Sequence, residues 1–95
     1  MTSPSTSAHR ILVAEDETLI RMDLVEMLRE AGYDVVGAAS DGSEAVSLAE
    51  SLKPDLAILD VKMPILDGIS AAEKIISISP VLMLTAFSQK DLVER

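Results

Sequence analysis

Cysteine and tryptophan are absent from the sequence, and Tyr33 and Phe87 supply its whole 2% of aromatic residues. Without cysteine, the chain has neither disulfide bonds nor thiolate metal sites. With so few aromatic rings, its core must consist of aliphatic side chains and methionine. The 95 residues, 48% of them hydrophobic, are enough for one domain with a core of modest size.

Positive charge is also scarce. Sixteen acidic residues stand against eight lysines and arginines, which gives a formal net charge of -8. This excess of negative charge disfavours direct binding of the chain to nucleic acid or to an anionic membrane. A divalent cation, or a partner that carries basic residues, suits the charge better.

Long hydrophobic runs are missing as well. No run approaches the roughly 20 apolar residues that a membrane-spanning helix requires, and residues 1–8 (MTSPSTSA) lack the apolar segment of a signal peptide. We therefore expect a cytoplasmic protein in which residues 1–8 form a disordered tail and residues 9–95 form the single domain. His9 lies beside the tail, and we interpret it as incidental to function.

Short apolar runs recur along the chain at residues 11–14, 35–39, 56–59 and 81–84. None of them alternates between polar and apolar residues, so each predicts a strand buried on both faces, as in a parallel sheet. Amphipathic segments between the runs predict helices. These segments span residues 18–31, 43–52 and 68–77. Strands that alternate with helices predict an α/β fold with right-handed crossovers and helices on both faces of the sheet.

The spacing of apolar residues also predicts which face of each helix points inward. The predicted inward residues are Ile20, Leu24, Met27, Leu28 and Ala31, then Ala45, Leu48, Ala49 and Leu52, then Ile69, Ala72, Ile75 and Ile76. Gly32 is placed to end the first helix, and Ser40 or Asp41 to cap the start of the second. Ser88 is the candidate N-cap of a fourth helix that still continues at Arg95.

Polar residues directly follow three of the predicted strands: Glu15 and Asp16 the first, Asp60 the third, and Thr85 the fourth. Ligands of such sheets bind outside the carboxyl ends of the strands, so these side chains should share one rim. Three neighbouring carboxylates raise one another's pKa unless a cation neutralises them, and Mg²⁺ accepts such ligands together with water and phosphate. With Mg²⁺ bound, Asp60 stays an ionised nucleophile that can form an aspartyl phosphate. The Thr85 hydroxyl could donate a hydrogen bond to a phosphate oxygen.

Each of these residues also has a purely structural explanation. Acidic residues in the first turn of a helix complement its dipole, an aspartate after a strand often serves a turn, and a threonine commonly ends a strand. Met63 is interpreted as packing, and Pro64 with Asp67-Gly68 as turn chemistry. The combination of acidic pair, aspartate and threonine at matching strand ends favours a chemical site over these alternatives.

The stretches ILVAEDE, LAILDVKMPILDG and VLMLTAF resemble the receiver domain of bacterial two-component response regulators, over residues 10–95. The resemblance implies a flavodoxin-like, doubly wound parallel sheet. It also implies that Asp60 is the phosphoacceptor for a histidine kinase, and that Thr85 is the switch hydroxyl that contacts the phosphate. The implied protein ligands of Mg²⁺ are Asp16, Glu15 (mostly through water), Asp60 and the backbone carbonyl of Lys62.

Two longer stretches, EDETLIRMDLVEMLREAGYDVVG and LTAFSQKDLVER, resemble receivers attached to a C-terminal ANTAR domain. This resemblance implies an RNA-binding output that prevents transcription termination. We therefore expect RNA binding only through such an output domain, outside these 95 residues. The resemblance also implies a possible homodimer, because receivers often dimerise.

Receivers of this family have five strands in the order 2-1-3-4-5, whereas this sequence supplies four. We therefore expect the order 2-1-3-4 in an incomplete receiver domain. The fifth strand, the fifth helix and the lysine that pairs with the phosphoryl group are expected to be missing, and Lys90 comes too early in the sequence to be that lysine. The fourth strand is then an exposed apolar edge, so we expect the chain to fold poorly alone.

Three functions remain open at this point. The first is a phosphoaccepting signalling switch, which transfers phosphate only onto its own Asp60 and is not otherwise an enzyme. The second, an Mg²⁺-dependent phosphohydrolase of the haloacid dehalogenase type, needs an aspartate where this chain has Lys62. The third, a degenerate receiver that binds partners without being phosphorylated, is favoured by the missing lysine. The joint presence of Glu15, Asp16, Asp60 and Thr85 favours the first.

Overall fold

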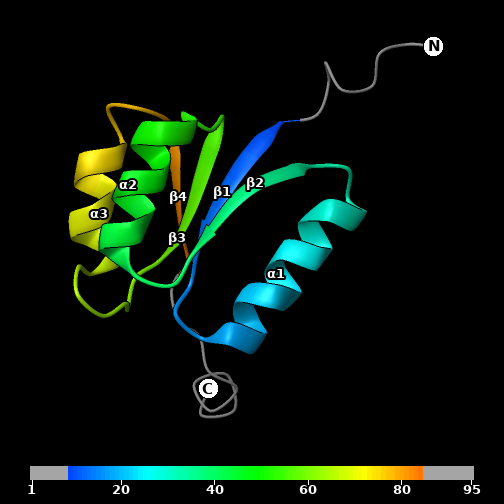
Figure 1. The fold of residues 1–95 in the computed structure, drawn as a ribbon, viewed down its shortest axis with the longest axis horizontal. Helices are drawn as coiled ribbons and strands as arrows, with labels where there is room; N and C mark the ends of the chain where they lie inside the picture. Colours follow the sequence, from blue (N-terminus) through cyan, green and yellow to red (C-terminus); the bar gives the residue numbers. More distant parts are fainter. Residues whose placement is uncertain (1–8, 85–95) are drawn as a thin grey trace, which may run out of the picture.

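The computed structural model describes residues 9–84 and shows three layers (Figure 1). A parallel sheet forms the middle layer, with its strands in the order β2-β1-β3-β4. Helices α2 and α3 cover one face of this sheet, and α1 covers the other. The predicted order 2-1-3-4 is confirmed, and the architecture is the flavodoxin-like, doubly wound one.

The elements in chain order are β1 (Arg10–Ala14), α1 (Thr18–Glu30), β2 (Asp34–Ala39), α2 (Gly42–Leu52), β3 (Leu56–Asp60), α3 (Gly68–Ile75) and β4 (Val81–Leu84). Their bounds agree with the predicted spans to within two residues. The predicted tail (residues 1–8) and the predicted fourth helix lie outside the described residues, and the division of the chain into tail and domain stays a prediction. Within residues 9–84, every helix is too short or too polar to cross a membrane.

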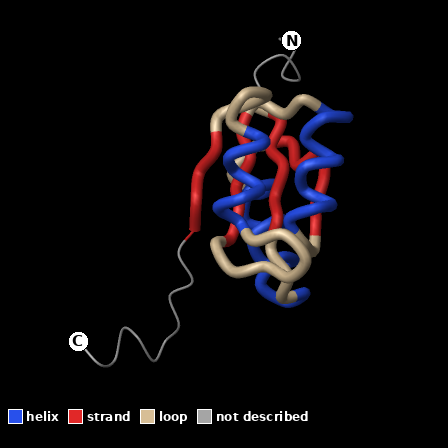
Figure 2. Tube along the Cα trace, turned by 90° about the vertical axis from the view of Figure 1, so that its left-hand side faces the viewer, coloured by secondary structure: helices blue, strands red, loops and turns tan. Residues whose placement is uncertain are grey.

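The central strands β1 and β3 carry the core because both of their faces are covered. Alternate residues of β1 point to opposite faces. Leu12 packs with Leu59 on the side of α2 and α3, whereas Ile11 and Val13 pack on the side of α1. The prediction that all four strands are buried on both faces is wrong for the outer two. Leu82 of β4 is 49% exposed, because β4 and β2 form the edges of the described sheet (Figure 2).

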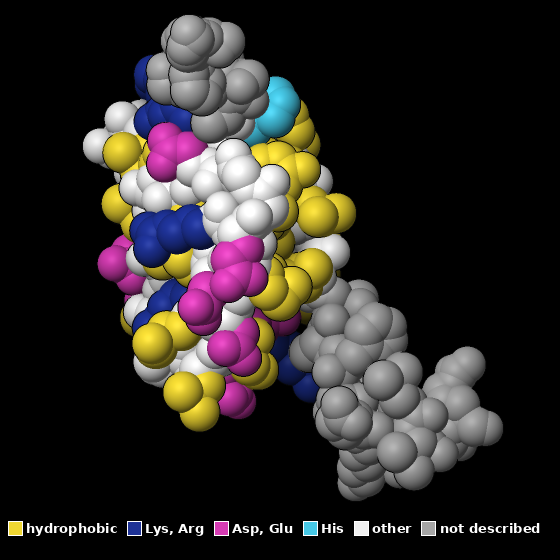
Figure 3. Space-filling view, turned by 90° about the vertical axis from the view of Figure 1, so that its right-hand side faces the viewer, with side chains coloured by type: hydrophobic (Ala, Val, Ile, Leu, Met, Phe, Trp, Pro, Cys, Tyr) yellow, Lys and Arg dark blue, Asp and Glu magenta, His cyan; other side chains and the backbone are white. Residues whose placement is uncertain are grey.

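Helix α1 covers its side of the sheet loosely. Leu24 and Leu28 contact the cluster beneath them, as predicted, but no residue of α1 is fully buried. Three residues predicted to face inward are exposed: Ile20, Met27 and Ala31. Only a narrow strip of the helix reaches the sheet, so its other apolar residues remain at the surface. Figure 3 shows this side of the molecule, with hydrophobic side chains exposed among acidic ones.

Gly32 ends α1 as predicted. Its φ is +99°, in the left-handed region that glycine adopts without a steric penalty. The N–H of Gly32 donates to the Arg29 carbonyl, and the N–H of Tyr33 donates to the Leu28 carbonyl, each at 3.0 Å. These two bonds form a Schellman motif, which satisfies carbonyls at the end of the helix.

Helix α2 agrees with the prediction at its face and at its start. Ala45 and Ala49 are fully buried against the sheet. Asp41, and not Ser40, is the N-cap, because its Oδ1 accepts a hydrogen bond from the Glu44 N–H at 2.8 Å.

The inward face of α3 differs from the prediction. Ala71 and Ile75 are fully buried, whereas Ile69 and Ile76 are exposed. Helix α3 begins so close to β3 that a Cβ atom on Gly68 would lie 1.9 Å from the Asp60 carbonyl oxygen. Positions 68, 71 and 75 share one face at helical spacing, and this close approach turns that face inward and Ile69 and Ile76 outward, so the prediction is confirmed for Ile75 and wrong for the other two isoleucines.

Candidate functional site

Two of the predicted site residues stand at the ends of neighbouring central strands. β1 and β3 pair in parallel, with Ala14 opposite Leu59. The residues that follow, Glu15 and Asp60, therefore lie side by side at the carboxyl edge of the sheet. The backbone N–H of Glu15 donates to the Ala39 carbonyl at 3.0 Å, which fixes this residue against the end of β2 as well.

The acidic side chains form one compact group. One carboxylate oxygen from each of Glu15, Asp16 and Asp60 lies within 4.8 Å of the other two. Glu15 and Asp60 are each 5% exposed, while Asp16 is open to solvent. Across the part of the chain that the structure describes, no other group of three His, Asp or Glu side chains is arranged in this way. The fold thus brings together the three carboxylates that the sequence pattern placed on one rim.

The Glu15 carboxyl has a pKa raised from its ordinary 4.5 to about 7. Burial is the largest cause, and the negative charge of Asp60 and side-chain hydrogen bonds with Asp16 and Asp60 act in the same direction. The Glu17 N–H donates to Glu15 Oε2 at 2.9 Å and opposes the shift by stabilising the ionised form. Below about pH 7, the cluster without a metal therefore holds a proton on Glu15, chiefly because burial disfavours the ionised form.

The donor set suits a hard divalent cation. Mg²⁺ takes oxygen ligands, commonly one or two carboxylates together with several waters. Glu15 and Asp60 supply buried carboxylates, and exposed Asp16 leaves the outer side of the cluster accessible to water. A bound cation would offset the cost of burying the Glu15 carboxylate and its repulsion by Asp60, which together keep the proton on Glu15. The residues present therefore fit Mg²⁺.

The loop between β3 and α3 folds back against the phosphoacceptor candidate. The Gly68 N–H donates to the Val61 carbonyl at 2.9 Å and closes this loop. Asp67 caps α3, because its Oδ1 accepts a hydrogen bond from the Ser70 N–H at 2.8 Å. Asp67 and Gly68 thus have the turn and helix-start roles that the sequence predicts, and they hold the loop beside Asp60.

Two further predicted residues are less fully placed. Lys62 lies in the loop two positions beyond Asp60, and the role of its carbonyl as a metal ligand stays a prediction. Thr85 lies outside the described residues. The described part of β4 nevertheless reaches the site, because Leu84, the residue before Thr85, pairs with Asp60.

Sequence reasoning missed one residue at the site, Arg21, which is not among the residues predicted to face inward. Its Nη1 atom donates to the carbonyl of Glu15 at 2.7 Å and makes a longer contact of 3.5 Å with the carbonyl of Asp16. Helical periodicity could not reveal this contact, because the side chain turns back past the helix start towards the preceding loop. The available signal was an arginine in the fourth position of a helix that follows three acidic residues.

The comparisons with known proteins agree with this geometry. The sequence profile of the response regulator receiver domain matches residues 11–95. The chain is 64% identical over 102 aligned positions to the transcriptional regulatory protein PdtaR of Mycobacterium tuberculosis, a match that covers all of this chain and half of PdtaR. It is 37% identical to the chemotaxis protein CheY of Thermotoga maritima, over 88% of this chain and 72% of that protein.

Among solved structures, the chain is similar to one in the CheX–CheY–BeF3–Mg²⁺ complex of Borrelia burgdorferi. The TM-score is 0.81 with 26% sequence identity, and the match covers 97% of this chain and 73% of that one. The chain spans about half the length of PdtaR, so the activity and partners of a longer protein do not follow from these matches. The profile match over nearly the whole sequence, together with the shared fold, shows that this chain belongs to the response regulator receiver domain family.

Proposed function

We propose that this receiver domain is a phosphoaccepting switch in two-component signalling. Asp60 receives the phosphoryl group from a phosphorylated histidine of a histidine kinase. Mg²⁺ is held by the carboxylates of Glu15, Asp16 and Asp60, and by the carbonyl of Lys62. The observation that supports this proposal is the meeting of three carboxylates at the ends of β1 and β3.

The chemistry is a displacement at phosphorus. A carboxylate oxygen of Asp60 attacks the phosphorus atom, the P–N bond of the phosphohistidine breaks, and the released imidazole takes up a proton from solvent. When bound, Mg²⁺ offsets the negative charge of the carboxylates and of the transferring phosphoryl group. Asp60 is suited to this attack because β3 and the closed β3–α3 loop hold it in one position. The Thr85 hydroxyl donates a hydrogen bond to a phosphate oxygen.

We further propose that the switch controls transcription antitermination through an RNA-binding output domain. The similarity to PdtaR, which is named a transcriptional regulatory protein, supports this proposal. The net charge of -8 also favours an RNA contact outside this domain. Within this account the domain catalyses only its own phosphorylation, and its protein partners are the kinase and possible second copies of the chain.

Phosphorylation is tested with acetyl phosphate as a small phosphodonor in the presence of Mg²⁺. We expect the intact mass of the chain to increase by one phosphoryl group, and we expect no increase for Asp60→Asn. Asp67→Asn is the matched control, since this nearby carboxylate caps a helix and asparagine can cap it equally well. A folded protein that gains no mass would support the degenerate interaction module, and sustained turnover of the donor would support the phosphohydrolase.

A further inference from the structure

Arg21 connects helix α1 in two ways to the loop that precedes it, residues 15–17, called the acidic loop below. Its backbone N–H donates to the Glu17 carbonyl at 2.9 Å, as the first turn of the helix requires. Its half-buried side chain turns back and donates from Nη1 to the Glu15 carbonyl at 2.7 Å, with a contact of 3.5 Å to the Asp16 carbonyl. A single guanidinium therefore touches the peptide groups on both sides of the Asp16 Cα atom.

We propose that Arg21 is a positioning residue that directs the Asp16 carboxylate towards Glu15 and Asp60, an inference that rests on the proposed Mg²⁺ site. The carbonyl of Glu15 belongs to the peptide unit that joins Glu15 to Asp16. Fixing this carbonyl fixes the plane of that unit, and the plane sets the direction in which the Asp16 side chain leaves the backbone.

The other polar groups of Glu15 already have partners, which leaves its carbonyl to Arg21. The Glu15 N–H donates to the Ala39 carbonyl at 3.0 Å, and its Oε2 accepts from the Glu17 N–H at 2.9 Å. Among the described residues, Asp16 is exposed and makes no backbone hydrogen bond with the sheet, and its side chain hydrogen-bonds only with that of Glu15. The guanidinium thus orders the one member of the acidic group that the sheet does not hold.

The charge of Arg21 and its hydrogen bonds have opposite effects on a cation. Arginine stays protonated in proteins, and a positive charge beside the site repels Mg²⁺. If charge were its main effect, removing Arg21 would tighten Mg²⁺ binding. If positioning is its main effect, removing it weakens binding, because outer-shell partners of metal ligands change affinity by about 10–100-fold. Whether Mg²⁺ binding becomes tighter or weaker when Arg21 is replaced therefore distinguishes the two roles.

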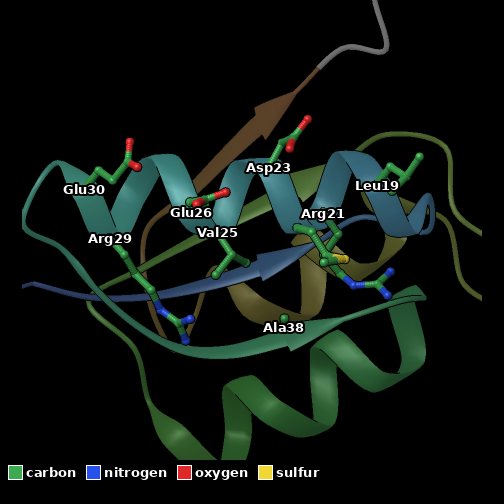
Figure 4. A pocket seen from close by; sticks show the side chains of 9 residues that line it. Leu19, Arg21, Asp23, Val25, Glu26, Arg29, Glu30 and Ala38 are labelled. Atoms are coloured by element: carbon green, nitrogen blue, oxygen red, sulfur yellow. The ribbon is translucent and has the colours of Figure 1, made fainter.

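Arg29 provides a matched control on the same helix. Both arginines line a hollow between α1 and β2, whose lining also includes Val25 and Ala38. Figure 4 shows the side chains of both arginines on the β2 side of α1, while Asp23 and Glu30 point away. The Arg29 side chain forms no hydrogen bond with any other residue in the range 9–84, so its replacement removes the same charge without disturbing the acidic loop.

The experiment titrates Mg²⁺ into the full chain and follows backbone amide signals by NMR. We expect Arg21→Gln to raise the Mg²⁺ dissociation constant about tenfold, Arg21→Lys to raise it less, and Arg29→Gln to leave it within about twofold. Before Mg²⁺ is added, the amide signals of Asp16 and Glu17 should shift in Arg21→Gln and stay in place in Arg29→Gln.

Unchanged or tighter Mg²⁺ binding in a folded Arg21→Gln protein would overturn the positioning role. If that variant does not fold, unchanged or tighter binding in Arg21→Lys has the same consequence. A wild-type chain that is folded and binds no Mg²⁺ would instead contradict the proposed function. In that case the metal-free amide signals still decide the inference, since unshifted Asp16 and Glu17 signals in Arg21→Gln reject the contact.

Discussion

At the scale of single residues, the surroundings of Glu15 disfavour the ionised form of its carboxyl group. Glu15 is nearly buried next to Asp60, and its pKa is raised to about 7 from 4.5, chiefly by burial. Below pH 4.5 the group is protonated in both the folded and the unfolded chain. As the pH rises from about 4.5 to 7, the folded state retains the proton that the unfolded state releases, so stability falls.

Glu15→Gln should therefore stabilise the protein at high pH. Glutamine keeps an oxygen for the Glu17 N–H and carries no charge. In EDTA at pH 8, we expect the free energy of unfolding to increase by roughly 1–3 kcal/mol, the upper end being the whole pKa shift expressed as energy. At pH 4.5 we expect little difference, because the folded state holds the proton and the unfolded state still holds it about half of the time. Urea unfolding at the two pH values measures the effect.

The exposed Glu73 supplies the control, because Glu73→Gln removes an equal charge from the surface of α3. Its effect on stability should stay within about 0.5 kcal/mol at both pH values. If Glu15→Gln were no more stable than the wild type at pH 8, the raised pKa of the Glu15 carboxyl in the folded protein would be disproved.

The carboxylates of the site were predictable from the sequence, whereas the contacts that orient them were not. Glu15 and Asp60 were predictable, because each directly follows a buried strand and parallel strands end at a common edge. Arg21 was not predictable from helical periodicity, since its partner is a backbone carbonyl in the preceding loop. The only trace of this contact in the sequence is an arginine in the first turns of a helix that follows acidic residues, and that pattern alone does not specify the partner.

At the scale of elements, the start of α3 packs very tightly against the end of β3. A Cβ on Gly68 would meet the Asp60 carbonyl oxygen at 1.9 Å and the Val61 Cα at 2.9 Å. Both atoms belong to backbone and cannot rotate away as a side chain does. Helix α3 and strand β3 can be this close only because position 68 is glycine.

Gly68→Ala should therefore destabilise the domain by at least about 2 kcal/mol, because the added methyl group forces α3 away from β3. Gly32→Ala is the matched control. No atom lies within 4 Å of a Cβ at position 32, so its cost is only that of a left-handed φ of +99°, about 1 kcal/mol. Urea unfolding compares the two, and a Gly68→Ala loss no larger than that of Gly32→Ala would contradict the tight junction.

The bounds of the elements were predictable, whereas two of the helix faces were not. Apolar runs and turn residues located every described strand and helix to within two residues. The prediction for α3 is confirmed for Ile75, but it also placed Ile69 and Ile76 inward, whereas the close approach at Gly68 turns Ala71 inward in their place. The face of a helix is thus decided by the distance to its neighbour, which residue spacing alone does not contain.

At the scale of the whole molecule, the acidic site is part of a chain with a net charge of -8. A cation that binds only the folded state stabilises the entire domain, since its binding free energy adds to the free energy of unfolding.

The predicted order of the sheet is confirmed. The expectation that the chain folds poorly alone remains a prediction, and its stability with and without Mg²⁺ can be measured directly.

Mg²⁺ at about 100 times its dissociation constant should raise the free energy of unfolding at pH 8 by about 2.7 kcal/mol relative to EDTA. Asp16→Asn should lose most of this gain, because it removes one of the three carboxylates. Asp67→Asn should keep it. Sodium chloride at the same ionic strength controls for general screening of the acidic surface, and an equal gain in sodium chloride would argue against a specific site.

The most direct test of the central claim is to identify the phosphorylated residue. The chain is treated with acetyl phosphate and Mg²⁺, reduced with borohydride to convert an aspartyl phosphate to homoserine, and sequenced by tandem mass spectrometry. We expect homoserine at position 60 and at no other aspartate, and we expect no conversion when EDTA replaces Mg²⁺. Homoserine at another position, or none in a folded protein that has bound Mg²⁺, would contradict the claim.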